Sequence, residues 1–225
     1  MTTVGLLLFP GLTQLDLTGP YEVLARMPDT QVVLAALSDG PVKSEFGLTI
    51  LPDRRLDPAD TFDVLVVPGG PGVNRLLDDD AFLDCLAAVA ARAQWITAVC
   101  TGALLLGAAG LLAGYRATTH WQSLELLPLV GATPVAERVV IDRNRITGGG
   151  ISAGIDFGLT LAATLHGQAV AERIQLVMEY APAPPFAAGA PATADPQLVR
   201  EVSAQRQALF NERRASLLRR QPKKK

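Results

Sequence analysis

The sequence contains few of the residues that form metal sites and disulfide frameworks. Its 225 residues include two histidines and two cysteines, Cys85 and Cys100. The cysteines lack the paired spacing of zinc ligands, and two in a chain of this length do not make a disulfide scaffold. We therefore expect neither a metal site nor disulfide bonds.

Long hydrophobic segments are also missing. The first apolar run, Val4–Phe9, ends after six residues at Pro10-Gly11, and no other run approaches the length that spans a bilayer. Met1–Thr3 contains no basic residue, so the start does not resemble a secretory signal peptide. These features predict a soluble, cytoplasmic protein with no membrane partner.

Aromatic residues are scarce and neither charge dominates. Only 5% of the residues are aromatic, whereas 49% are hydrophobic, and the net charge is −2. The near-neutral balance makes nucleic acid an unexpected partner. A composition dominated by Ala, Leu and Val suits helices packed on a buried sheet, and the length allows one α/β domain with a small extension.

The basic residues gather at the C-terminal end. Residues 195–225 contain nine Arg and Lys against three Asp and Glu, a net charge of +6, so that the rest of the chain carries about −8. A Pro- and Ala-rich linker, Ala181–Pro196, precedes an Arg-rich helix predicted over Leu198–Leu218. We interpret this helix as a solvated one with a frayed basic end, in preference to one that contacts nucleic acid or an acidic surface. The predicted division is a domain over residues 1–180 and a linker with a basic helical extension over 181–225.

Short apolar runs alternate with amphipathic segments along the first 180 residues. Buried strands are predicted over Val4–Phe9, Gln31–Leu37, Phe62–Val67 and Trp95–Val99. Helices are predicted between and after them, and hairpins over residues 42–51 and 139–147. Such alternation predicts an α/β fold with a mainly parallel sheet, helices on both faces, and a site at the carboxyl ends of the strands.

Cys100 stands where the last of these strands meets a helix of small residues. A cysteine at such a junction is held out of the sheet on a tight turn, where free N–H groups of the helix lower its pKa and bind a developing anion. The alternative is an ordinary buried cysteine, the interpretation that applies to Cys85 on the apolar face of its helix.

Two further loops are expected at the same edge of the sheet. Asp16 follows the first strand among leucines, where burial would raise its pKa for acid–base work, although an aspartate there also suits a helix N-cap. The turn Pro68–Gly72 lacks the pattern of a phosphate loop. It is either a plain tight turn or bare backbone whose N–H groups, at Gly70 and Gly72, face a substrate anion together with the amide of Gly102.

Two more side chains are candidates by position. Thr101 follows Cys100, and its hydroxyl is either an ordinary residue of the first helical turn or a group that orients the nucleophile or a water molecule. His120 ends the run Thr118-Thr119-His120. It is either the partner of a Cys–His pair or a hydrogen-bonded structural histidine, and we favour the structural role over a direct base.

Taken together, these segments resemble the ThiJ/PfpI superfamily, whose members are related to class I glutamine amidotransferases. The likeness covers about residues 3–180 and implies a three-layer flavodoxin-like sandwich and a homodimer. The matching motifs, in order along the chain, are Phe9-Pro10-Gly11 with Asp16, Val67-Pro68-Gly69-Gly70, Ala98-Val99-Cys100-Thr101-Gly102, Ala117-Thr118-Thr119-His120-Trp121 and Gly148–Asp156.

Within the superfamily the chain resembles the isonitrile hydratases most. Those enzymes have a nucleophilic cysteine followed by threonine and an aspartate in the first strand–helix loop, positions held here by Cys100, Thr101 and Asp16. The resemblance implies hydration of an isocyanide to an N-substituted formamide through a thioimidate on Cys100. Asp16 would act as acid and base and Thr101 would hold the water, with no cofactor.

Two alternatives remain open. The Cys-Thr-Gly and Thr-Thr-His-Trp segments also resemble the sensor domain of AraC-type regulators, which would bind a small molecule without turnover. In this chain only about 30 residues follow the linker, which is room for one long helix and not for two helix-turn-helix units. The other alternative is a hydrolase or stress protein of the superfamily that uses the same thiol on another substrate.

Overall fold

A computed structural model describes residues 1–221 of the chain. Its central sheet has seven strands in the order β10-β11-β7-β6-β1-β2-β5, all parallel except for the antiparallel pair β10 and β11. This confirms the predicted mainly parallel sheet. The strands are β1 (Thr2–Leu8), β2 (Thr30–Ala36), β5 (Arg54–Arg55), β6 (Val64–Val67), β7 (Trp95–Val99), β10 (Val139–Asp142) and β11 (Arg145–Gly148).

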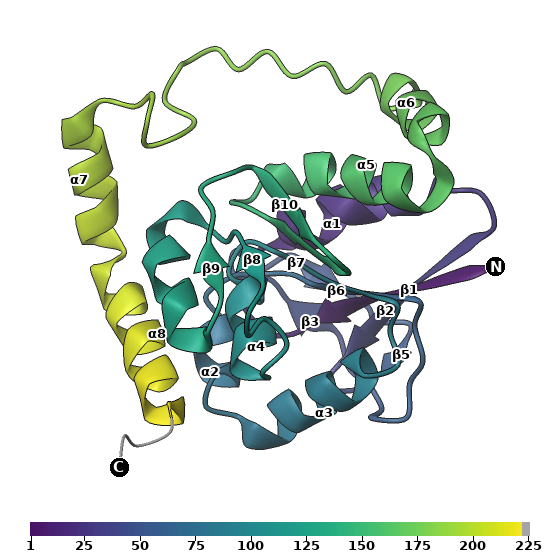
Figure 1. Cartoon of the computed structure of the whole chain (residues 1–225), viewed down its shortest axis with the longest axis horizontal. Helices are drawn as coiled ribbons and strands as arrows, with labels where there is room; N and C mark the ends of the chain where they lie inside the picture. The colour runs from purple at the N-terminus through teal and green to yellow at the C-terminus, as the bar shows by residue number, and fades with distance from the viewer. Residues whose placement is uncertain (222–225) are drawn as a thin grey trace.

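Helices cover both faces of the sheet, as Figure 1 shows. One layer contains α1, α5 and α6, and the other contains α2, α3 and α4. The predicted three-layer sandwich is therefore confirmed. The bounds are α1 (Gln14–Leu24), α2 (Val73–Leu76), α3 (Asp80–Ala90), α4 (Gly102–Ala108), α5 (Ala153–His166) and α6 (Gln168–Val177).

Smaller elements surround this frame. Both predicted hairpins form: β3 (Val42–Lys43) pairs with β4 (Thr49–Ile50), and β10 pairs with β11. The sequence did not predict the short parallel pair β8 (Arg116–Ala117) and β9 (Thr133–Pro134), or the 3₁₀ helix η1 (Trp121–Val130) between them. A ten-residue 3₁₀ helix is unusual, and here Pro128 lies inside it.

The position of β1 in the sheet determines where the loops meet. From β1 the chain first adds β2 on one side, and then returns to add β6, β7 and β11 on the other. The order therefore reverses between β1 and β6, and the loops that leave the carboxyl ends of these strands diverge to leave a crevice. The loop after β1 leads to Asp16 in the first turn of α1, and the loops after β6 and β7 contain Gly69 and Cys100.

Glycines allow α1 and α5 to pack closely. A Cβ atom on Gly154 would lie 2.9 Å from Pro20 Cδ, and one on Gly158 would lie 2.9 Å from Val23 Cβ. The two glycines are four residues apart on α5, so they share the face that meets α1. This contact fixes the start of α1, and with it Asp16, against the body of the domain.

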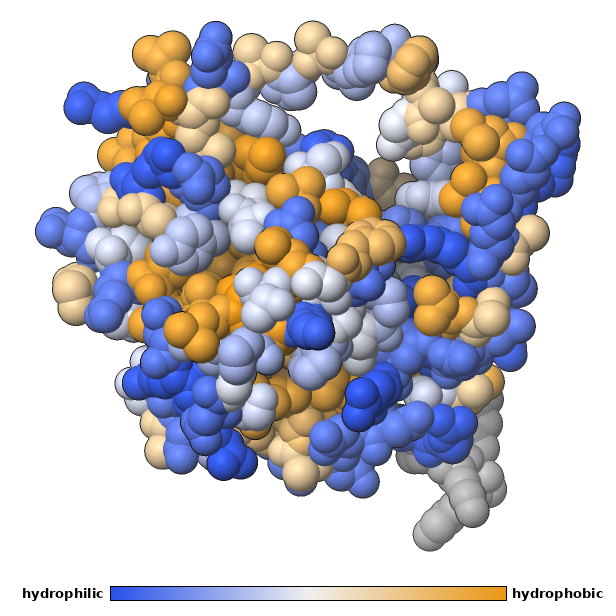
Figure 2. Space-filling model, turned by 180° about the vertical axis from the view of Figure 1, so that it is seen from behind, coloured by the Kyte–Doolittle hydropathy of each residue, from blue (hydrophilic) through white to orange (hydrophobic). Residues whose placement is uncertain are grey.

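The C-terminal arm, residues 181–221, differs from the prediction in two respects. The linker arches over the surface in Figure 1, and Figure 2 shows the same arch from behind; its first residues are exposed, as expected. The single predicted helix, however, is two helices, α7 (Pro196–Gln205) and α8 (Gln207–Arg220), which meet at Arg206. The interpretation as a solvated helix is wrong for α8, which packs on η1 and α2 and buries Arg213, Ser216 and Leu217, whereas α7 buries no residue. The predicted frayed basic end at residues 223–225 lies outside the described residues.

Within residues 1–221, no helix is both long and apolar enough to cross a membrane.

The contact between α1 and α5 gives a test of the fold. We expect Gly158→Leu to lower the free energy of unfolding by about 1–3 kcal/mol, because the new side chain overlaps Val23 in a close-packed contact. Thr164→Leu, on the exposed face of the same helix, is the matched control and should change stability little. Urea unfolding followed by circular dichroism measures both, and equal effects of the two variants would contradict this packing.

Candidate active site

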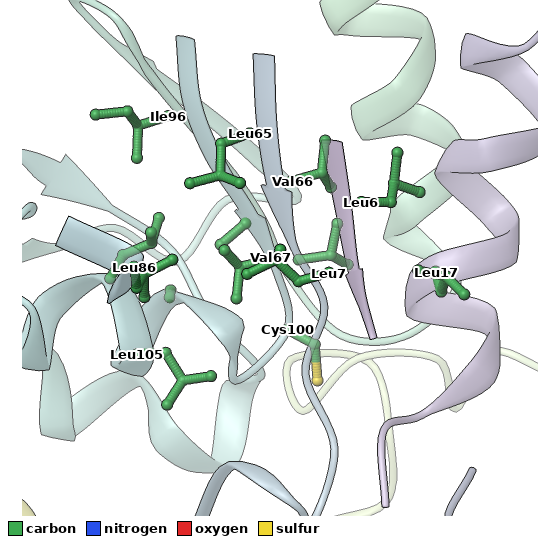
Figure 3. Close-up of a cluster of buried hydrophobic side chains, with 14 of the residues drawn as sticks. Leu6, Leu7, Leu17, Leu65, Val66, Val67, Leu86, Ile96, Cys100 and Leu105 are labelled. Carbon is green, nitrogen blue, oxygen red and sulfur yellow. The ribbon is translucent and has the colours of Figure 1, made fainter. Parts of the chain in front are cut away.

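Cys100 occupies a strained turn at the carboxyl end of β7. Its φ of 56° lies in the left-handed region, which is unusual for a residue other than glycine. The turn is held by its backbone: the Cys100 N–H donates to the carbonyls of Gly148 (3.0 Å) and Gly149 (2.9 Å), and its carbonyl accepts from Thr119 Oγ1 (2.7 Å). In Figure 3 the sulfur points away from the aliphatic side chains of the sheet. The predicted strand-to-helix turn is confirmed.

Two glycines bring the backbone close to this turn. A Cβ atom on Gly69 would lie 2.5 Å from the Thr101 nitrogen and 2.9 Å from Cys100 Cβ, so a side chain at position 69 would displace the turn. A Cβ atom on Gly102 would overlap the carbonyls of Val67 and Pro68. Gly102 is therefore needed for close packing of α4 on the end of β6.

Asp16 is fully buried within the first turn of α1. The N-cap of this helix is Thr13, so the alternative interpretation of Asp16 as the cap is wrong. Its Oδ2 accepts from the Gly69 N–H (3.2 Å), while its Oδ1 accepts no hydrogen bond among the described residues. Burial raises the pKa of Asp16 to about 7, and the negative charge of Glu45 adds to this effect.

Cys100 and Asp16 are close enough that each changes the pKa of the other. Burial and the negative charge of Asp16 raise the pKa of the Cys100 thiol well above its usual range, while the Thr101 N–H lowers it. The expected lowering of the thiol pKa by the helix start is therefore outweighed by burial. The two groups titrate as a pair, which carries one negative charge over the range between its two pKa values.

Two of the three candidate anion-binding amides, those of Gly70 and Gly72, are already bonded within the protein. The Gly70 N–H donates to Thr101 Oγ1 (3.0 Å), and the Gly72 N–H donates to the Gly11 carbonyl (3.0 Å). The Thr101 hydroxyl in turn lies 3.4 Å from the Gly70 carbonyl, to which it donates. In this arrangement Thr101 fixes the Gly70 turn beside Cys100, and the amides of Gly70 and Gly72 are not free to bind a substrate anion.

His120 lines the same small cavity as Cys100. Burial, with the positive charges of Arg206 and Arg213, lowers the pKa of His120 to about 4, so its ring is neutral at pH 7. Its Nδ1 accepts from the Gln122 N–H (3.3 Å). The proton of the neutral ring therefore lies on Nε2, which makes His120 a hydrogen-bond donor to the cavity and not a base.

Residues of the C-terminal arm complete this cavity, and the sequence did not predict them as part of the site. Arg213 and Arg206 line it together with the Cys100 turn, in a volume of about 10 Å³. This is about the space of one water molecule. One sequence signal was present: Phe210, Arg213 and Leu217 are spaced three and four residues apart, which places Arg213 on the apolar face of α8.

A larger groove of about 560 Å³ lies between η1 and the arm. It shares Arg206 with the cavity at Cys100, and its wall is mostly apolar, with Trp121 and Phe210 as the largest side chains. Within residues 1–221, no cluster of three or more His, Cys, Asp or Glu side chains is arranged to hold a metal ion.

Comparison with known proteins places this geometry in context. The chain is 54% identical to isonitrile hydratase of Pseudomonas putida over 198 residues, covering 88% of this chain and 87% of that protein. It is 32% identical to the HTH-type transcriptional regulator GbdR of Pseudomonas aeruginosa over 79% of this chain, which is 50% of the regulator.

The fold matches solved structures as well. The crystal structure of a ThiJ/PfpI family protein from Pseudomonas syringae superposes with a TM-score of 0.93 at 40% identity, covering 96% of this chain and 90% of that chain. This coverage extends into the C-terminal arm. The model of the DJ-1/PfpI family matches residues 2–164, which include β1 to β11 and every residue of the predicted site. The chain belongs to the DJ-1/PfpI family.

Proposed function

We propose that the protein hydrates an isocyanide to an N-substituted formamide, with Cys100 as nucleophile and Asp16 as proton carrier. The observation that carries the proposal is the buried Cys100–Asp16 pair at the end of β7, in a chain that is 54% identical to an isonitrile hydratase. A buried pair that shares one proton supplies both an anionic sulfur and an acid when that proton passes from Cys100 to Asp16, and these are the two groups that addition to an isocyanide needs.

The first step forms a covalent thioimidate. The sulfur of Cys100 bonds to the terminal carbon of R–N≡C while that carbon takes the proton of Asp16, which gives R–N=CH–S–Cys100 and a carboxylate. The Thr101 N–H, which favours the anionic sulfur, holds the nucleophile before addition. Within residues 1–221, Asp16 forms no ion pair with an arginine or lysine, so its proton is not lost to a permanent counter-ion.

The second step consumes water. The Asp16 carboxylate takes a proton from water as the oxygen adds to the thioimidate carbon, and the proton passes to the nitrogen. The resulting R–NH–CH(OH)–S–Cys100 loses its hydroxyl proton to Asp16 as the carbon–sulfur bond breaks. The product is R–NH–CHO, and the pair regains its one proton and one negative charge. His120, which lines the cavity, is the proposed donor that polarises the nitrogen or oxygen during these changes through its Nε2–H.

The groove between η1 and the arm is the proposed site for the R group. The cavity at Cys100 is too small for a cyclic or aromatic substituent, whereas the adjoining groove is apolar and has ample volume. A substituent bound there requires a local shift of side chains around Arg206, which is exposed at the α7–α8 junction.

A non-catalytic sensor is the second candidate, because the chain is also 32% identical to half of a transcriptional regulator. Such a protein would bind a small molecule at the same cavity without turnover. Formation of formamide separates the two functions directly.

The assay of substituted variants tests the hydratase proposal. We expect wild-type protein to convert cyclohexyl isocyanide to the formamide, and Cys100→Ala to lower kcat at least about a thousandfold because the nucleophile is gone. Asp16→Ala should lower it at least about a hundredfold through loss of the proton carrier. Cys85→Ala removes the other thiol and should leave the rate unchanged. Absence of turnover by the wild type would exclude the hydratase, and activity of Cys100→Ala would exclude the covalent mechanism.

The pH dependence tests the role of Asp16. Because burial raises the pKa of Asp16 to about 7, the pair gains a second proton below that pH and loses the negative charge that addition needs. We expect kcat/KM to fall as the pH falls through about 7. Asp84→Asn, which changes an exposed carboxyl on α3, should show the same profile as the wild type. A fall that begins only near pH 4 would mean that a carboxyl with an unshifted pKa controls the rate.

The same pKa shift predicts a change in stability. The folded protein holds the Asp16 proton more tightly than the unfolded chain, so the stability from this group is complete below about pH 4 and is lost as the pH rises through about 7. Asparagine cannot ionise. We therefore expect Asp16→Asn to raise Tm at about pH 8 and to change it little at about pH 4. A variant that is less stable than the wild type at the higher pH would contradict the burial argument.

A further inference from the structure

Arg213 is a buried cation that forms no salt bridge within residues 1–221. Its residue is 8% exposed, on the face of α8 that packs against the domain. A buried charge is costly unless something compensates for it. The position of this cation beside a functional cavity therefore requires an explanation.

Hydrogen bonds orient the guanidinium toward the cavity. Arg213 Nε donates to Asn74 Oδ1 (2.7 Å) and Nη1 donates to Ser123 Oγ (3.3 Å), so side chains of α2 and η1 hold the group from two sides. Asn74 is itself fixed, because its Nδ2 donates to Glu212 Oε2 (2.7 Å). Within residues 1–221 no hydrogen bond uses Nη2, and Arg213 lines the cavity that contains Cys100.

The charged groups that act on Cys100 and on Asp16 from outside the pair differ in sign. On the side of α8, Arg213 acts on Cys100 and favours a negative sulfur. On the side of the β3–β4 hairpin, Glu45 acts on Asp16 and opposes a negative carboxylate. Glu45 is held there because its Oε1 accepts from Thr13 Oγ1 (2.6 Å) at the start of α1.

The remaining charges do not change this arrangement. His120 is neutral at pH 7, and Arg206 is exposed at the junction of α7 and α8. Glu212 and Glu45 both lie near enough to Arg213 to favour its charged form. The pair is therefore flanked by a cation beside the sulfur and an anion beside the carboxyl.

We propose that Arg213 is a positioning residue, brought from the C-terminal arm, that favours the anionic form of the Cys100 sulfur over its protonated form. This is the reactive form in the proposed hydration, so the inference deepens that function and gives the arm a part in it. Arg213 acts through Cys100 and forms no bond to the substrate. The arm is then part of the active site, although it lies beyond the residues that the family model matches.

Alkylation of Cys100 by iodoacetamide tests the proposal without any isocyanide, so its result is independent of the hydratase assay. The reagent is uncharged, which removes any attraction between it and the arginine. The rate is followed across pH by mass spectrometry of the peptide that contains Cys100, which separates it from Cys85. We expect Arg213→Met to move the midpoint to higher pH and to slow alkylation about tenfold at neutral pH, the equivalent of one pKa unit.

Two further variants separate charge from packing. Arg213→Lys keeps the cation and should restore most of the rate. Arg219→Gln removes a cation that docks the same helix through Asp78, and it should leave the midpoint unchanged. An Arg213→Met protein alkylated at the wild-type rate or faster would overturn the proposal. So would an Arg213→Lys midpoint shifted as far as that of Arg213→Met, because the loss would then be one of packing.

Discussion

The left-handed turn at Cys100 is the constraint on which the site depends. The turn presents the sulfur at the end of β7, and it is kept there by the backbone carbonyls of Gly148 and Gly149 at the end of β11 and by the Thr119 hydroxyl. Strain of this kind persists only when the surroundings determine it fully. Gly69 is one such determinant. Because it has no side chain, the Cys100 turn can lie against its backbone, and its N–H donates a hydrogen bond to Asp16.

Burial determines how Asp16 and Cys100 share charge and protons. Asp16 and Cys100 are both removed from water, so neither holds a charge easily alone, and together they carry a single negative charge. The environment determines which atom carries that charge. The Thr101 N–H and Arg213 favour a negative charge on the sulfur, and Glu45 opposes one on the carboxyl. Groups from the start of α4, from α8 and from the β3–β4 hairpin therefore all affect the same shared proton.

Sequence patterns predicted the parts of this protein that depend on local signals. Apolar runs ending in Gly and Pro located the main strands, and the Cys100 junction and the Asp16 loop followed from the topology they imply. Effects that depend on tertiary contacts were not predictable. The pKa of the Cys100 thiol depends on its burial, and the Gly70 N–H is bound by the Thr101 hydroxyl. The sequence pattern did not distinguish the buried Arg213 from the other arginines of the tail. Its place on the apolar face of α8 was the available signal.

The covalent role of Cys100 is the central claim, and the most direct test is the mass of the enzyme during turnover. Wild-type protein is mixed with cyclohexyl isocyanide, quenched in acid at successive times, and examined by intact and peptide mass spectrometry. The account predicts an added mass of one isocyanide on the peptide containing Cys100, which forms and decays at least as fast as formamide appears. Turnover without this adduct, or with an adduct on Cys85 alone, would contradict it.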